Sequence, residues 1–442
     1  MKKVFALFLL AFVLTLSGCS DIIESNTDLM RPPHPTGEKA VIQDVLTELA
    51  GGDFALKYPQ NGEYISAIIM EDLTHSGESD AIALYVPNNG ETGIHVAFIS
   101  EVNDKWQSIG DFTVKADEID RVLFADIDGD KSDEILIGWT NNNSAVHTLT
   151  VYDCDNDNVR EMVIDDTYNE ICVSDLTGNG CYEIVLLSLA VKDTPASAKI
   201  LQYSENEKRP TAKFSVELSS ETVKYVKVTV GQLDNRSNCI FIDGETNGGV
   251  WSTEMIYWDS ESGTFINPMY FTNLETTNQT SRNMTIPTQD IDLDGYTEVP
   301  VITEMPANID EDPATVCSLV SWKSFSTEER ILTTKINTVI NRNQNYCFAI
   351  PDRWNGIITA RIENDNMVFY LWNTEKSVRS DKLLTISSNE LSEKNNTAIK
   401  VTIKNGKHLY AYIEKTTRLS KNNTALQISE NEVLNGFFTI TN

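Results

Sequence analysis

The stretch FADIDGDKSDEILIGW, residues 124–139, places four acidic side chains within nine positions: Asp126, Asp128, Asp130 and Glu134. Oxygen atoms at positions 1, 3 and 5 of a tight loop converge on one point, and a backbone carbonyl at position 7 and an acid at position 9 can complete the shell. Ca²⁺ takes about six to eight such oxygen ligands and relieves the repulsion between neighbouring carboxylates. The spacing therefore predicts a calcium-binding loop. The alternative is an Asx-type turn, whose oxygens accept hydrogen bonds from the loop's own amides.

The same spacing recurs along the chain. The copies are Asp72, Thr74, Ser76 and Asp80; Asp126, Asp128, Asp130 and Glu134; Asp175, Thr177, Asn179 and Glu183; and Asp290, Asp292, Asp294 and Glu298. A decayed fifth copy runs from Gln232 to Ile240, and the copies start about 50 to 58 residues apart. A period of this size indicates a propeller or a solenoid.

The copies differ in their number of carboxylates. Those beginning at Asp126 and Asp290 have four each and are the first candidates for calcium. The copy at Asp175 has two, so we expect it to bind more weakly, and the copy at Asp72 more weakly still. We expect no calcium at the decayed copy.

An EF-hand begins with the same spacing but requires a glutamate at position 12 and flanking helices. Position 12 is Ile137, Leu186 or Val301 in the second, third and fourth copies. These residues lie in runs of β-formers, so the EF-hand is excluded.

The sequence between the loops is rich in strand-forming residues. Alternation or β-branched and aromatic enrichment marks five segments: 93–100, 147–153, 224–230, 254–260 and 264–271. About four short strands per period fit a propeller blade, and the lack of long helical patterns excludes a βαβ repeat.

The loops resemble those of FG-GAP and VCBS repeats, the family of integrin-α-like β-propellers, whose pattern is close to D-x-D-G-D-G-x-x-[DE] followed by a hydrophobic strand. The resemblance covers about residues 58–322 and implies a propeller whose loops bind calcium for structure. Lys131 replaces the second glycine of the pattern in one copy, and the copy at Asp290 keeps Gly295 but lacks the first glycine.

The N-terminus reads as an export signal. Two lysines precede an apolar run from Val4 to Leu16, which is too short to span a bilayer. The sequence Leu16-Ser17-Gly18-Cys19 resembles a bacterial lipobox, in which Cys19 is lipidated; the alternative is an ordinary secretory signal. Two acyl chains anchor a protein stably. We therefore expect the protein to be lipid-anchored in the cell membrane, on its extracellular face.

The predicted fold is mainly β, a propeller of five to seven blades followed by a small α+β domain. The segment 38–52 has helical spacing, and a hairpin with Asn405-Gly406 at its turn lies in the last domain. That domain resembles, over a short stretch, the C-terminal module of Firmicutes lipoproteins with FG-GAP-like repeats. The predicted segments are a signal peptide at 1–19, a tether and short helix at 20–57, the propeller at 58–325, a linker or helix at 326–344 and the α+β domain at 345–442.

Charge and motif content narrow the function. A formal net charge of −30 argues against nucleic-acid binding, which needs a basic face. The five histidines are scattered, with no His-Glu-x-x-His motif, and no Gly-x-Ser-x-Gly elbow occurs. We expect the six cysteines after Cys19 to be mostly buried free thiols. The favoured interpretation is a binding or scaffold module for a protein or glycan; the alternative is a propeller-based hydrolase acting on cell-wall or exogenous glycans.

Overall fold

The computed structural model describes residues 38–74, 76–103, 105–142, 144–155, 158–235, 237–270, 278–391, 398–403, 406–414 and 423–440. The predicted signal peptide and Cys19 lie outside these residues. Within them, no helix combines the length and the apolar character needed to cross a bilayer.

The strands form six antiparallel sheets that follow one another along the chain. The first contains β1 (Phe54–Leu56), β2 (Ile68–Glu71), β3 (Asp80–Pro87), β4 (Ile94–Glu101) and β5 (Trp106–Val114). The second contains β6 (Glu118–Ala125), β7 (Glu134–Thr140), β8 (His147–Asp155) and β9 (Asn158–Tyr168). The third contains β10 (Glu170–Ser174), β11 (Glu183–Ser188), β12 (Ser197–Ser204) and β13 (Arg209–Glu217).

The remaining three sheets are also antiparallel. The fourth contains β14 (Thr222–Gln232), β15 (Asn238–Thr246), β16 (Trp251–Asp259) and β17 (Thr264–Ile266). The fifth contains β18 (Val299–Glu304), β19 (Ser318–Ser326), β20 (Ile331–Asn341), β21 (Tyr346–Ala349) and β27 (Phe437–Thr439). The sixth contains β22 (Ile358–Glu363), β23 (Asn366–Asn373), β24 (Val378–Ser387), β25 (Ile399–Thr402) and β26 (His408–Ile413). The predicted mainly β, propeller-type fold is confirmed.

Short helices complete the described chain. They are α2 (Glu38–Leu49), η1 (Asn278–Thr280), η2 (Pro313–Thr315), η3 (Asp352–Trp354), η5 (Thr424–Leu426) and α3 (Glu430–Leu434). The predicted amphipathic helix after the tether is therefore confirmed as α2.

Each central strand packs against both neighbouring sheets because successive side chains of a strand point to opposite faces. Ile135 and Ile137 of β7 pack in one core with the first sheet, and Leu136 between them packs in another with the third sheet. The same alternation places Val185 of β11 against the fourth sheet and Ile184 against the second. A strand covered on both faces needs a continuous apolar run, and such a run comes directly after the acidic motifs that lead into β7 and β11.

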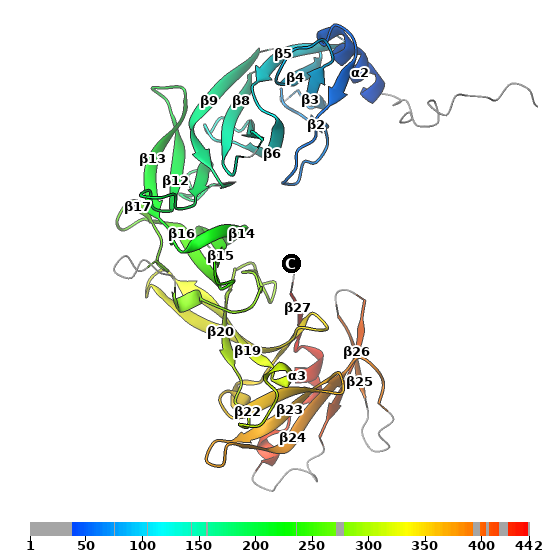
Figure 1. The fold of residues 1–442 in the computed structure, drawn as a ribbon, viewed down its shortest axis with the longest axis vertical. Coiled ribbons are helices and arrows are strands. Elements are labelled where there is room, and N and C mark those ends of the chain that lie inside the picture. Colours follow the sequence, from blue (N-terminus) through cyan, green and yellow to red (C-terminus); the bar gives the residue numbers. More distant parts are fainter. Residues whose placement is uncertain are drawn as a thin grey trace, which may run out of the picture.

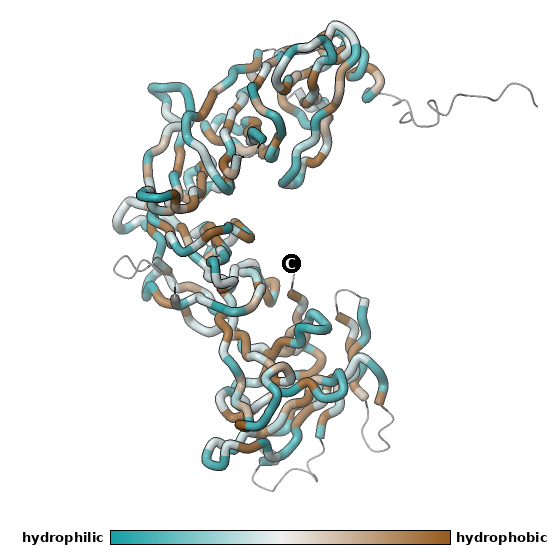
Figure 2. Tube along the Cα trace, in the orientation of Figure 1, coloured by the Kyte–Doolittle hydropathy of each residue, from teal (hydrophilic) through white to brown (hydrophobic). Residues whose placement is uncertain are grey.

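The outer face of the first sheet is covered by α2. Ile42 and Leu46 are fully buried against alanines of β3 and β4, whose small side chains let the helix approach closely. Figure 1 shows the sheets in chain order along an open curve, with α2 and the first sheet at one end and the sixth sheet at the other. Figure 2 shows apolar residues recurring along the strands of every sheet. Helix α2 thus covers the exposed face of the first sheet and ends the row of sheets, as a capping element ends a repeat protein.

Three predicted boundaries differ from the structure. The segment 326–344, predicted as a linker or helix, contains β20, whose β-branched residues continue the pairing with β19. The boundary at 345 passes through the fifth sheet, because β21 pairs with β20 and the late strand β27 returns to pair with β21. The first sheet already includes β1, before residue 58. The final segment is thus integrated with the fifth sheet by strand pairing, which a local pattern does not reveal.

All six cysteines in the described part of the chain are free thiols, as expected. Four of them are buried: Cys154, Cys239, Cys317 and Cys347. Burial raises the pKa of the Cys154 and Cys347 thiols to about 12. These side chains act as small apolar packing groups.

Replacing Leu46 by alanine tests the role of α2. We expect Leu46→Ala to lower the free energy of unfolding by about 2–5 kcal/mol, because it opens a cavity under a fully buried side chain. The matched control is Val41→Ala on the same helix, where the side chain is 42% exposed and the loss should stay below about 1 kcal/mol. Urea unfolding measures both, and equal losses would contradict the capping role.

Candidate metal centre

Every copy of the acidic motif lies at the entry to a strand. In four copies this is an inner strand of the sheet, and in the copy from Asp290 it is β18, at the edge of the fifth sheet. The loop from Asp72 leads into β3, the loop from Asp126 into β7 and the loop from Asp175 into β11. The decayed copy from Gln232 leads into β15, and the copy from Asp290 into β18. Four of the five copies therefore occupy the same structural position, before an inner strand of their sheet.

The first aspartate of each loop turns back onto the loop's own backbone. The carboxylate oxygens of Asp126 accept hydrogen bonds from Gly129 N at 2.7 Å and Lys131 N at 3.0 Å. The equivalent residues accept amide hydrogen bonds in the same way: Asp72, Asp175 and Asp290. This is the geometry of an Asx-type turn, and it leaves lone pairs on each oxygen for a cation.

The acid at the ninth position enters the core in each loop. Glu134 is 1% exposed and accepts a hydrogen bond from Ile127 N at 2.8 Å. The equivalent acids are buried and bonded alike: Asp80, Glu183 and Glu298. A buried charge is costly unless it is paired, so the groups facing this acid decide how each loop is neutralised.

In the loop at Asp126, further carboxylates face the buried acid. Asp126, Asp128 and Glu134 present oxygen atoms that lie within 4.8 Å of one another. Asp130 is not part of that group, and its carboxylate accepts a hydrogen bond from a loop amide. Ile135 of β7 pairs with Tyr152 of β8, and the next residue of β8, Asp153, acts electrostatically on Glu134. Burial, together with the charges of Asp128 and Asp153, raises the pKa of Glu134 to about 8.

A basic side chain on the strand β9 is already paired with another acid. Arg160 of β9 pairs with Asp153 at 2.6 Å, and no ion pair to Asp126, Asp128 or Glu134 is present among the described residues. The converging atoms are all oxygens, the donor type that calcium prefers. The residues present in this loop therefore fit a calcium ion.

The loop at Asp175 is neutralised by uncharged donors. The Thr177 hydroxyl and the Gln202 side-chain amide each donate to Glu183 Oε1 at 3.0 Å. Asn179 turns to its own loop and accepts from Cys181 N at 2.7 Å. Of this predicted set, only Thr177 and Glu183 are therefore joined directly.

The loop at Asp290 contains a second group of acids and also a base. Asp290, Asp292 and Asp294 present oxygens within 4.8 Å of one another. Lys335 of β20 forms ion pairs with Asp292, Asp294 and Glu298. The carboxylates at positions 3, 5 and 9 thus share one ammonium group.

The segment before this loop is fixed by a buried ion pair. Arg282 and Asp243 are both almost fully buried, and their side chains meet at 2.6 Å. Asp243 also accepts a hydrogen bond from Thr288 N at 2.8 Å, two residues before the loop begins. This network sets the approach of the chain to Asp290.

The loops also join neighbouring sheets. Tyr182 N, in the third sheet's loop, donates to the carbonyl of Asp126 at 2.8 Å. Thr297 N donates in the same manner to the carbonyl of Gln232 at 3.0 Å. A change in the conformation of one loop therefore alters a hydrogen bond to the neighbouring sheet.

Two departures from glycine in the motif occur where the backbone is left-handed. Lys131 has φ of 77° and Leu293 has φ of 63°, while the corresponding Gly180 and Gly178 have φ of 90° and 72°. A non-glycine residue there costs on the order of 1 kcal/mol. The loops keep their shape despite this strain.

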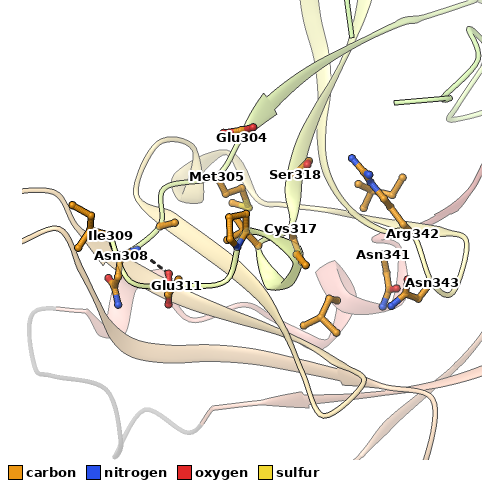
Figure 3. A pocket seen from close by; sticks show the side chains of 16 residues that line it. Glu304, Met305, Asn308, Ile309, Glu311, Cys317, Ser318, Asn341, Arg342 and Asn343 are labelled. Carbon is orange, nitrogen blue, oxygen red and sulfur yellow. Dashed lines mark hydrogen bonds between the residues drawn. The ribbon is translucent and has the colours of Figure 1, made fainter. Parts of the chain in front are cut away.

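A pocket lies between the fifth and sixth sheets. Its volume is about 410 Å³, within the range of small-molecule sites. Figure 3 shows Arg342 and Asn343 on one side of the pocket, Asn308 and Glu311 on the other, with Met305 between them. The pocket therefore combines polar rim groups with an apolar interior.

The loop that forms one wall of this pocket is held by a buried arginine. Arg361 is 1% exposed, and its guanidinium contacts Glu311 at 2.6 Å and the carbonyl of Pro306 at 2.8 Å. Arg379 lies 3.0 Å from the other oxygen of Glu311. The exposed Arg342 has no hydrogen-bond or ion-pair partner within the described part of the chain, so its guanidinium is available to a ligand.

Neither the family models nor the curated proteins gave a match to this chain. Solved structures similar to it include an exotype rhamnogalacturonan lyase, YesX, at 11% identity, covering 81% of this chain and 84% of the other with a TM-score of 0.32. A periplasmic gluconolactonase from Pseudomonas aeruginosa is 8% identical over 75% of this chain and 95% of its own, with a TM-score of 0.31. An exo-β-1,3-galactanase from Phanerochaete chrysosporium is 10% identical over 80% and 76%, with a TM-score of 0.25.

Several groups at the loops were missed by sequence reasoning. Gln202, Lys335 and Asp153 reach the ninth-position acids from strands later in the same sheets. The spacing within the motif does not predict these residues, because strand pairing brings them to the loops. Arg342 and the pocket were missed for the same reason.

The raised pKa of Glu134 predicts a pH dependence of stability after chelation. The folded state holds this proton more tightly than the unfolded chain, so its contribution is complete below about pH 4.5 and is lost as pH rises through about 8. In the chelated protein, the free energy of unfolding should fall by a few kcal/mol as pH rises from about 4.5 to about 8. Glu134→Gln should abolish this fall, because glutamine does not ionise. Urea unfolding in EDTA from pH 5 to 9 measures it. Asp133→Asn, an exposed neighbour with the same charge change, should retain the slope, and equal slopes in both variants would contradict the assignment.

Proposed function

We propose that the chain is an extracellular binding or scaffold protein whose loop at Asp126 is stabilised by calcium. The observation that carries the proposal is the convergence of Asp126, Asp128 and Glu134 within 4.8 Å, with Glu134 buried. Calcium would neutralise a carboxylate that otherwise enters the core unpaired. It would also fix the loop whose backbone joins the second and third sheets.

We also propose that the protein carries a lipid anchor, and the support for this comes from the sequence alone. The apolar run and the Leu16-Ser17-Gly18-Cys19 motif support lipidation of Cys19 and a position on the outer face of the cell membrane. In an extracellular setting calcium is abundant, and weak sites of about 10⁻⁴–10⁻³ M suffice there.

The pocket between the fifth and sixth sheets is the proposed ligand site. Its rim offers a guanidinium, amides and carboxylates, and its interior offers apolar side chains: Arg342, Asn341, Asn343, Glu304, Met305 and Ile340. Such a mixture suits sugar units, whose hydroxyls form hydrogen bonds and whose ring faces are apolar. A glycan is therefore the ligand class that we propose.

Calcium titration of the chelated protein tests the loop. We expect calcium to raise the free energy of unfolding by roughly 2.7 kcal/mol at a hundredfold excess over Kd. Asp128→Asn should strongly reduce this gain, because it removes one negative charge and replaces one carboxylate oxygen by an amide NH2 group. Isothermal calorimetry and thermal unfolding with and without calcium provide the readout.

Asp133→Asn is the control for this titration as well, since it lies in the same loop but outside the ligand positions. The calcium proposal would be abandoned if calcium left the melting temperature of the unaltered protein unchanged.

A glycan panel tests the pocket. We expect retention of a subset of wall glycans without release of reducing ends, and we expect Arg342→Ala to weaken that retention about tenfold or more. Arg330→Ala, on the fourth and fifth sheets' surface away from the pocket, is the control. Release of reducing ends that a single acidic substitution outside the loops abolishes would instead establish the hydrolase.

A further inference from the structure

We propose that Lys335 is the built-in cation of the loop at Asp290, so that this loop holds an ammonium group where the loop at Asp126 takes calcium. Only the comparison with calcium in the loop at Asp126 rests on the proposed function. It departs from the expectation drawn from the motif, which made both four-carboxylate loops calcium sites.

The geometry is that of a cation with oxygen ligands. Lys335 Nζ lies 3.1 Å from Asp292 Oδ1, 2.5 Å from Asp294 Oδ2 and 2.9 Å from Glu298 Oε1. An ammonium group has three hydrogen-bond donors, and each meets a different carboxylate. These acids hold positions 3, 5 and 9 of the motif, whose oxygens would face a metal ion.

A charge on the buried Glu298 would be strongly unfavourable without a paired positive charge. The Glu298 side chain is fully buried, and that of Lys335 is 24% exposed. Burial opposes the ionisation of Lys335, but hydrogen bonds to the three carboxylates outweigh it, and the pKa of the lysine lies above its ordinary value. A divalent ion entering this space would have to displace a charged group that already has its partners.

A β-bulge directs Lys335 to the loop. Trp322 of β19 pairs with Ile336 and Lys323 pairs with Thr334, which leaves Lys335 as an extra residue on β20. Bulges re-aim a side chain relative to its sheet. The bulge therefore turns the Lys335 side chain toward the loop, whereas regular pairing would not.

The other sheets provide internal comparisons. The equivalent bulge in the third sheet holds Lys213, which is exposed, and there Gln202 contacts the buried acid instead. The first sheet has Ile109 at its bulge. The second sheet pairs regularly at this level, and no bulged side chain is sent toward Glu134. The one loop that combines four carboxylates with a regular partner strand is thus the loop at Asp126.

Counting calcium ions on full-length variants tests the proposal. We expect Asp292→Asn to leave the stoichiometry of the unaltered protein unchanged. Lys335→Met, which keeps the length of the side chain but removes the charge, should add one calcium ion per chain, and Lys335→Met with Asp292→Asn should lose it again. Lys323→Met, with the same charge change on the neighbouring strand, should add none. Calorimetry with Ca²⁺ and sensitised luminescence with Tb³⁺ measure the count.

The outcomes separate this inference from the calcium proposal for the loop at Asp126. Loss of a calcium ion in Asp292→Asn of the otherwise unaltered protein would overturn the role of Lys335, as would an unchanged count in Lys335→Met. Loss in Asp128→Asn concerns only the other loop. If Lys335→Met is unfolded after chelation, recovery of its native circular dichroism on adding calcium supports the inference, and failure to recover at any calcium concentration overturns it.

Discussion

The buried carboxylate at the end of each loop is the constraint on which the rest of the structure depends. The chain places an acid at the entry to a strand in four of its sheets, and each of these acids is at most 2% exposed. An isolated charge there would be strongly unfavourable. Each loop must therefore bring compensating groups to the same point, and the way it does so distinguishes otherwise similar repeats.

The repeats solve this problem with different chemistry. Thr74 supplies a hydroxyl donor in the first loop, and Thr177 with Gln202 supplies two neutral donors in the third. The fifth sheet uses Lys335. The second sheet supplies only more oxygens, and it is there that we place calcium. The loops also carry the backbone hydrogen bonds between adjacent sheets, so local neutralisation and the stacking of the row are coupled.

Much of the fold could be predicted from the sequence because its signals are local. The helix at Glu38–Leu49 follows from apolar spacing, and the strands β7 and β11 follow from unbroken apolar runs. The boundaries in the last third of the chain could not be predicted in this way. The pattern over 326–344 predicts a linker or helix where β20 forms, and β27 joins β21 from a distant part of the chain, a contact that only strand pairing reveals.

The sequence by itself determined where the loops lie and that a strand comes next, because a turn and the period of a strand are properties of consecutive residues. Only the tertiary structure decided which partner each buried acid receives. Lys335, Gln202 and Asp153 reach their loops through the register of separate strands, and in the fifth sheet through a single bulged residue. A shift of one residue turns a side chain to the opposite face, so the sign of the charge beside each acid was set by pairing and not by the motif.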